Sequence, residues 1–179
     1  MPGVWVFPGG AVDSEDGPDP ESEAAHRQCA ARELAEEAGV EVDPDDLVAY
    51  SRWITPRQVP IRFDTRFYLA ADPAAGEPRI DGREVIDWGW FEPSDALERH
   101  RGGGLDLVFP TVKHLESLLD SSDVNQLLER AASLEVRAVE PVIDLSEDGE
   151  PRIAFDPDDA DQPGTHMSEV DSAPPPGEA

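Results

Sequence analysis

The chain has 179 residues, 39% of them apolar, which is enough for one domain with a substantial core. Asp and Glu number 40 against 14 Lys and Arg, giving a formal net charge of −26. This charge argues against binding nucleic acid through its phosphates, which requires clusters of Lys and Arg. It would also repel an anionic substrate, so phosphate chemistry here would need a metal ion or local arginines.

Cysteine content and hydropathy favour a cytoplasmic protein. The single cysteine, Cys29, excludes an intramolecular disulfide. The sequence shows neither a signal-peptide pattern nor an apolar run long enough to span a bilayer. We therefore expect a cytoplasmic protein with neither a membrane nor a nucleic acid among its partners.

The first predicted elements are a strand and a helix separated by an acidic loop. Residues 4–7 are apolar on both faces of an extended chain, which is typical of a buried strand, and Pro8-Gly9-Gly10 ends it. The loop over 11–22 is rich in turn-forming residues. A helix is predicted from its end to Ala38, where Gly39 stops it.

This helix carries three glutamates on one side. At 100° per residue, Glu33, Glu36 and Glu37 fall within about a quarter of its circumference. Their charges repel at this spacing, so a cation is expected among them. A cluster that offers only oxygen ligands suits a hard ion such as Mg²⁺. The opposite side is apolar and expected to be buried: Ala24, Ala31, Leu34, Ala35 and Ala38.

The rest of the chain mixes strands, helices and a polar end. The sequence predicts strands over 47–55, 62–71 and 84–92, helices over 93–100, 111–119 and 124–134, and a hairpin of 137–145 with 152–155. From residue 156 onward there are seven acids, five prolines and no Lys or Arg. Because so polar a segment cannot offset its ordering entropy, we expect a domain over 1–155 and a disordered tail over 156–179.

The glutamate helix and its flanks resemble the Nudix box, whose pattern is a glycine, five residues, Glu, seven residues, then Arg-Glu-apolar-x-Glu-Glu-x-Gly-apolar. Residues 32–40 match the second half at every specified position. The first half departs from it, because the stretch from Gly10 to Arg32 is eight residues longer than in the box. Ala24 also stands eight residues before Arg32, where the box has glutamate. A solvated acidic helix face is the alternative, which Arg32, Gly39 and the preceding Pro-Gly-Gly disfavour.

Other segments are similar to a long-insert Nudix subgroup that includes coenzyme A diphosphatases: 4–10, 29–33, 52–56, 62–67 and 109–111. The resemblance implies an α/β fold, a Nudix-type α/β/α sandwich with a mixed central sheet. The family has strand pairing before the Pro-Gly-Gly segment, so we expect this sheet to lack its first strands. Either Met1 is internal to a longer reading frame or the protein is truncated. If the chain starts at Met1, an exposed sheet edge is expected, with a homodimer or poor solubility as the result.

The resemblance also assigns roles to individual residues. Glu33, Glu36 and Glu37 would hold Mg²⁺ or Mn²⁺ against a diphosphate, and either Glu36 or Glu37 would double as general base. Arg32 would pair with a carboxylate and orient the cluster. Glu84, just before a predicted strand, is a candidate extra metal ligand or base, with plain surface placement as the alternative.

Substrate contacts are predicted at two glycines and three arginines. Gly9 and Gly10 would let the backbone approach the helix and the phosphates. Arg57, Arg62 and Arg66 are candidate phosphate contacts, and a solvated surface is their alternative. The expected activity is metal-dependent hydrolysis of a small nucleoside diphosphate linked to another moiety, with coenzyme A or its thioesters as candidates. The alternative is a catalytically inactive Nudix-fold module that binds a nucleotide or regulates a partner.

Overall fold

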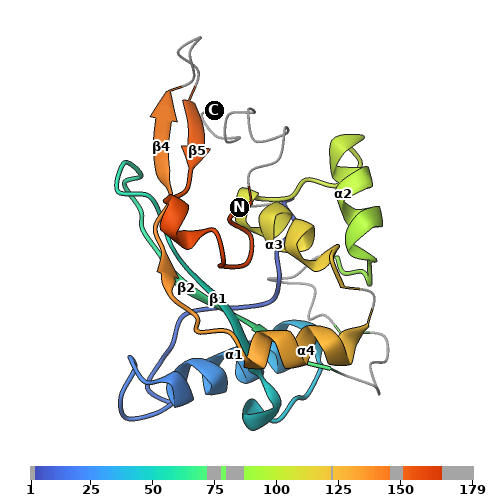
Figure 1. Cartoon of the computed structure of the whole chain (residues 1–179). Coiled ribbons are helices and arrows are strands. Elements are labelled where there is room, and N and C mark those ends of the chain that lie inside the picture. The colour runs from blue at the N-terminus through green and yellow to red at the C-terminus, as the bar shows by residue number, and fades with distance from the viewer. Residues whose placement is uncertain (1–2, 72–77, 80–86, 122, 146–150, 167–179) are drawn as a thin grey trace.

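The computed structural model describes residues 3–71, 78–79, 87–121, 123–145 and 151–166 (Figure 1). The helices within these ranges are α1 (Glu23–Ala38), α2 (Pro93–Arg101), α3 (Phe109–Leu118) and α4 (Val124–Ala132), with short 3-10 helices η1 (Pro44–Asp46) and η2 (Pro157–Asp159). The strands are β1 (Val48–Ile54), β2 (Asp64–Leu69), β3 (Ala138–Val139), β4 (Val142–Leu145) and β5 (Pro151–Ala154).

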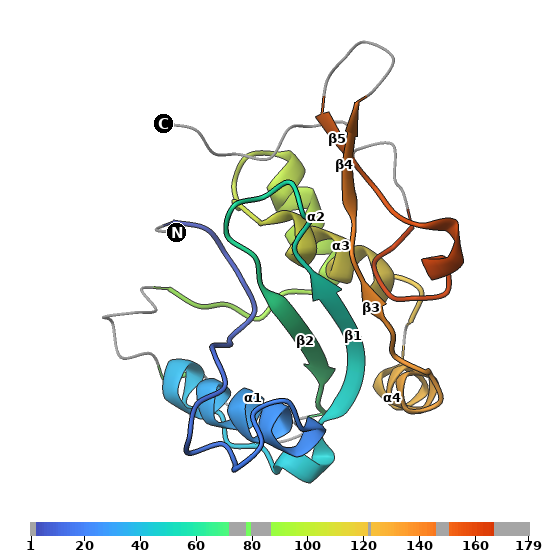
Figure 2. The same cartoon turned by 90° about the vertical axis from the view of Figure 1, so that its left-hand side faces the viewer.

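The central sheet has the strand order β2-β1-β3 and is mixed. β1 pairs with β2 antiparallel, and the register shifts between Ala49 and Ser51. β3 adds to the other edge of β1 in parallel. β4 and β5 form a separate antiparallel hairpin, which projects beyond the end of the sheet that lies away from α1 (Figures 1 and 2). The predicted hairpin is confirmed, although the first residues of its predicted strand join the main sheet as β3.

Helices cover both faces of the β1–β2 pair. On one face, Arg66 of β2 forms an ion pair with Glu23 of α1 at 3.0 Å. On the other, the Ser51 hydroxyl lies 2.5 Å from a ring nitrogen of His114 in α3, and the Phe67 ring stacks on the same imidazole at 4.0 Å. Figure 2 shows the two strands between α1 and α3. The predicted α/β/α sandwich with a mixed sheet is therefore confirmed.

The boundaries of α1 follow from its two caps. The Ser22 hydroxyl accepts a hydrogen bond from the Ala25 backbone N–H at 3.2 Å and so satisfies one free donor of the first turn. Gly39 ends the helix with a φ of 64°, a conformation that glycine adopts without strain. The buried side agrees with the predicted one at Ala31, but Ala25 and Cys29 are buried as well and Ala24 is exposed.

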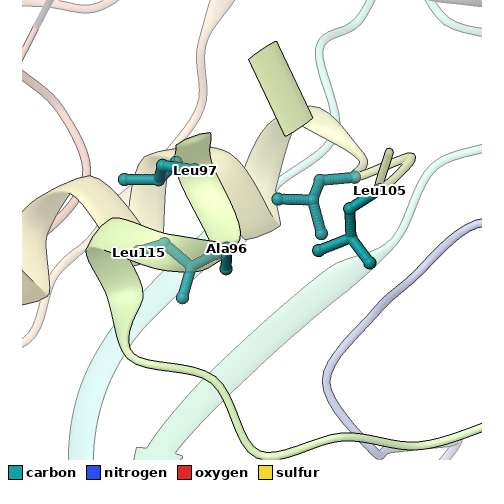
Figure 3. Packing of buried hydrophobic residues seen from close by; sticks show 5 residues of the cluster. Ala96, Leu97, Leu105 and Leu115 are labelled. Carbon is teal, nitrogen blue, oxygen red and sulfur yellow. The ribbon is translucent and has the colours of Figure 1, made fainter. Parts of the chain in front are cut away.

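The apolar core lies between α2, α3 and the loop that joins them. Its members are Ala96, Leu97, Leu105, Leu107 and Leu115 (Figure 3). Trp5 packs against this cluster and meets Phe91 edge-on, with ring centroids 5.5 Å apart.

Of the strands predicted next to this core, one is not formed and the described part of the other is not a strand. Trp5 makes only an isolated bridge to Leu107, and Val6 is 59% exposed, so the expectation of a buried strand over 4–7 is wrong. The described part of the other segment, residues 87–92, adopts no strand, and its remainder, with Glu84, lies outside the described residues. In each segment one aromatic side chain, Trp5 or Phe91, packs against the core, whereas Val6 and Trp90 are exposed.

Residues 156–166, whose composition led us to expect a disordered tail, pack on the domain. Gln162 is 1% exposed, and its side chain accepts a hydrogen bond from the Arg137 backbone N–H and donates one to the Glu135 carbonyl. The buried Lys113 ammonium donates to the His166 carbonyl. These contacts stabilise a segment whose composition alone indicates disorder. Within the described residues, no helix has the length and apolar character needed to cross a bilayer.

Candidate active site

The segment that contains Gly9 and Gly10 runs directly against the carboxylate side of α1. The Gly9 backbone N–H donates to Glu37 Oε2 at 2.9 Å. A Cβ atom at Gly10 would lie 2.1 Å from Glu33 Oε1, so no other residue fits there without moving the glutamate. The structure thus brings these two glycines together with two of the three predicted ligands.

Arg32 is the centre of this arrangement. Its Nε and Nη2 atoms donate to the two oxygens of Asp16, both at 2.9 Å, which is a bidentate fork. Its Nη1 atom donates to Glu33 at 2.8 Å and to Glu36 at 3.3 Å. The Asp16 side chain is 1% exposed, whereas that of Glu36 is 61% exposed. Arg32 therefore forms hydrogen bonds both to the buried Asp16 and to two carboxylates of α1.

Charge and burial set the protonation of this group. The hydrogen bonds from Arg32 hold the pKa of the Asp16 carboxyl below its usual value, against the opposing effect of burial. The same bonds raise the pKa of Arg32. Burial, with the nearby Asp16 charge, raises the pKa of the Cys29 thiol to about 11, so the thiol stays protonated at neutral pH. The protonated Cys29 thiol donates a hydrogen bond to the Gly10 carbonyl at 3.7 Å, so it supports the glycine segment and does not act as a nucleophile.

Asp16 is the residue that our sequence reasoning missed. It stands six positions after Gly10, which is the distance from glycine to glutamate in the Nudix box, and it pairs with the arginine of that box. The eight extra residues therefore lie between Asp16 and Arg32. Counted from Gly10, Asp16 stands where the first half of the pattern has glutamate, whereas counted from Arg32, Ala24 stands there.

The three glutamates do not converge on one point. Across the described ranges, no group of three or more His, Cys, Asp or Glu side chains is placed to hold a metal ion. Glu33 and Glu36 both pair with Arg32, whose charge offsets part of the repulsion from which we expected a cation. The donor chemistry still suits Mg²⁺ or Mn²⁺, since α1 offers carboxylate oxygens on one side and the Glu36 side chain is largely exposed.

The predicted phosphate-binding arginines lie elsewhere. Arg57 and Arg62 both pair with Glu140, at 2.8 and 2.9 Å. Arg66 pairs with Glu23, which precedes Glu36 by about 20 Å along the helix axis. A hollow of about 350 Å³ is lined by Arg57, Gln58, Glu140 and Val142, so it too lies apart from the α1 glutamates.

Comparison with known proteins decides the family. A family model described as the NUDIX domain matches residues 1–108, which is more than half of the chain. The chain belongs to the Nudix family. The resemblance carried by residues 32–40 is thereby confirmed at the level of the family.

Two curated relatives and one solved structure are similar to this Nudix chain. The Caenorhabditis elegans protein named nudix hydrolase 7 is 29% identical over 160 residues, covering 69% of this chain and 52% of the relative. The acyl-coenzyme A diphosphatase NUDT19 of Xenopus laevis is 29% identical over 110 residues, covering 58% and 29%. This chain thus spans about half of the first relative and under a third of the second. The crystal structure of a NUDIX hydrolase from Alicyclobacillus acidocaldarius has a TM-score of 0.62 and 27% identity, covering 72% of this chain and 81% of its own.

Proposed function

We propose that this Nudix chain hydrolyses the diphosphate linkage of a nucleoside diphosphate joined to another moiety, using Mg²⁺ or Mn²⁺ held by Glu33, Glu36 and Glu37. The observation that carries the proposal is the contact between α1 and the glycine segment. Glu37 accepts the Gly9 amide hydrogen, and Glu33 fills the space that a side chain at Gly10 would need. A backbone held this close to two helix carboxylates supports a site in which a ligand would contact both the glycine segment and α1.

The proposed roles of the site residues follow from how exposed their side chains are. A bound divalent ion would supply positive charge to offset that of the diphosphate. Arg32, fixed by the buried Asp16, keeps Glu33 in place against Gly10. Glu36 has the exposed carboxylate, so it has room to turn toward a ligand. Glu36 or Glu37 would accept the proton of the attacking water as general base.

The candidate substrates are coenzyme A and its thioesters. This part of the proposal is supported by the Xenopus laevis relative, which is named as an acyl-coenzyme A diphosphatase and is 29% identical over the matched region. The cytoplasmic location and the homodimer expected from the sequence stay predictions.

A substrate panel tests the activity. Coenzyme A, an acyl-coenzyme A, ADP-ribose and NADH are each incubated with the protein and Mg²⁺ or Mn²⁺, and the products are identified by mass spectrometry. We expect monophosphate products, and a loss of about 100-fold or more in kcat for Glu36→Gln or Glu37→Gln. Glu41→Gln, at an exposed position just beyond α1, is the matched control and should keep full activity. Unchanged turnover in both α1 variants would refute the assigned site.

A metal titration gives a readout that does not depend on turnover. Binding of Mn²⁺ is measured by calorimetry on the wild type and on Glu36→Gln. The variant should bind more weakly because it offers one carboxylate fewer, whereas Glu41→Gln should match the wild type. Equal affinity in all three proteins would place the metal elsewhere.

The second candidate function is a nucleotide-binding or regulatory module without catalysis. It is favoured by the arrangement of Glu33 and Glu36, which pair with Arg32 instead of converging with Glu37. This candidate predicts binding of a nucleoside diphosphate by calorimetry with no product from any member of the panel. Turnover that Glu36→Gln abolishes would eliminate it.

A further inference from the structure

We propose that Arg57 and Arg62, with Gln58 beside them, form a phosphate-binding site that the chain's own Glu140 occupies in this structure. This inference goes beyond the proposed function, because the site is formed by the β1–β2 loop and the residue after β3 rather than by α1. The test of this phosphate site is therefore independent of whether the α1 glutamates bind a metal ion.

The two guanidinium groups already hold an anion in the way they would hold a phosphate. Arg57 Nε donates to Glu140 Oε1 at 2.8 Å, and its Nη2 donates to Oε2 at 3.5 Å. Arg62 Nη2 donates to Oε1 at 2.9 Å. A fork of guanidinium N–H groups matches phosphate oxygens as well as carboxylate oxygens. The Glu140 carboxylate thus marks where a phosphate group would lie.

A hollow beside these side chains gives a ligand room to enter. Its volume is about 350 Å³, and its lining includes Arg57, Gln58 and Glu140 with the apolar Val142. The Arg57 side chain is 82% exposed, whereas that of Glu140 is 26% exposed. The arginine therefore faces solvent at the mouth, and the carboxylate lies further in.

The scaffold around the site is fixed independently of Glu140. Arg62 Nε donates to the Thr55 carbonyl at 2.9 Å, so this guanidinium keeps its direction when the carboxylate leaves. Gln58 Nε2 donates to the Ile143 carbonyl at 3.3 Å, which ties the β1–β2 loop to β4. Both contacts reduce the ordering that a ligand must impose.

Displacement of Glu140 is energetically feasible. The two arginines are exposed and Glu140 is partly exposed, so water screens these ion pairs and they hold the carboxylate only weakly. A phosphate monoester or pyrophosphate carries more negative charge than one carboxylate and offers additional acceptor oxygens. In a chain of net charge −26, two guanidiniums on one carboxylate also give a local excess of positive charge. A phosphate should therefore replace Glu140 at moderate concentration.

Calorimetric titration with inorganic pyrophosphate tests this site directly. A chelator is present, so that a divalent ion on α1 cannot contribute. Arg57→Gln should weaken binding about tenfold, since it removes a charged fork, and Glu140→Gln should strengthen it several-fold, since it removes the competitor. Arg152→Gln removes another exposed arginine, from the neighbouring hairpin, and should leave the affinity unchanged. No binding by the wild type, or equal losses in Arg57→Gln and Arg152→Gln, would overturn the proposal.

The phosphate could belong to a substrate or be free inorganic phosphate. Kinetics with coenzyme A and with dephospho-coenzyme A, which lacks one phosphate, separate these sources. If the site binds that phosphate of the substrate, Arg57→Gln should raise KM for coenzyme A alone. If it binds free phosphate, the variant should change neither KM while still losing pyrophosphate affinity. If the protein turns over none of the substrates, the proposed hydrolase function is refuted. The pyrophosphate titration still shows whether Arg57 and Arg62 bind phosphate.

Discussion

Acidification should destabilise the protein through one buried histidine. His114 is 2% exposed between β1 and α3, where one ring nitrogen lies 2.5 Å from the Ser51 hydroxyl and the other 2.6 Å from the Pro110 carbonyl. Burial lowers the pKa of this imidazole from 6.5 to about 4 in the folded protein. The ring is therefore neutral in the folded state throughout the range in which it becomes charged in the unfolded chain.

The sign and size of the effect follow from this difference in pKa. Between pH 6.5 and about pH 4 the unfolded state binds a proton that the folded state does not, so stability falls as pH falls. Each pH unit inside this window costs about 1.4 kcal/mol, and the whole window costs about 3 kcal/mol. Above pH 6.5 the contribution of His114 is fully present and does not change with pH.

Urea unfolding at pH 7, 6 and 5 measures the effect. The wild type should lose about 1 kcal/mol or more between pH 6 and pH 5, and His114→Gln should lose less by about that amount. The variant will be less stable at pH 7, so the comparison uses the pH dependence and not the absolute stability. His166→Gln, at an exposed position, serves as control. Equal pH dependence in the wild type and His114→Gln would refute the reasoning.

Two further predictions concern the packing around Arg32. Gly10→Ala would place a Cβ 2.1 Å from a Glu33 oxygen, so we expect turnover to fall at least tenfold. Gly9→Ala is the control, since no atom lies within 4 Å of its Cβ, and its turnover should fall less. Equal losses of turnover in the two variants would contradict the steric argument. Asp16→Ala would leave Arg32 without its buried partner and should lower the free energy of unfolding in urea by about 3 kcal/mol. Asp16→Asn should lower it less. A change under about 0.5 kcal/mol for Asp16→Ala would show that this pair does not stabilise the fold.

Local signals in the sequence predict the elements that carry the glutamates. Ser22 and Gly39 set the ends of α1 through capping and backbone conformation, and both effects act within a few residues. The sequence likewise predicts strands over 47–55 and 62–71, where the structure has β1 and β2, and these two strands pair with each other.

Long-range packing explains where the sequence misleads. The acidic composition after residue 155 indicates disorder, yet Gln162 is buried and forms hydrogen bonds with Arg137 and Glu135. No local sequence pattern predicts these contacts. Arg57 and Arg62 are five residues apart and look like independent surface charges. A carboxylate 78 residues beyond Arg62 brings them together. Contacts of this kind depend on the tertiary fold, so composition and periodicity do not predict them.

The acidic loop shows how an insertion can be accommodated without loss of a site. The glycine-to-acid spacing is intact, and Asp16 reaches Arg32 because both ends of the loop are fixed: one by the contact of Gly10 with Glu33, the other by the Ser22 cap. Only five residues separate Asp16 from Ser22, so the eight extra residues are shared between the exposed loop, whose closure entropy grows slowly with length, and the start of α1. An aspartate has a shorter side chain than a glutamate, so its backbone must lie closer to Arg32, and its burial at 1% side-chain exposure agrees with this. The pairing of Arg32 is therefore maintained by the spacing before the insertion, and the length of the insertion itself is not constrained by the site.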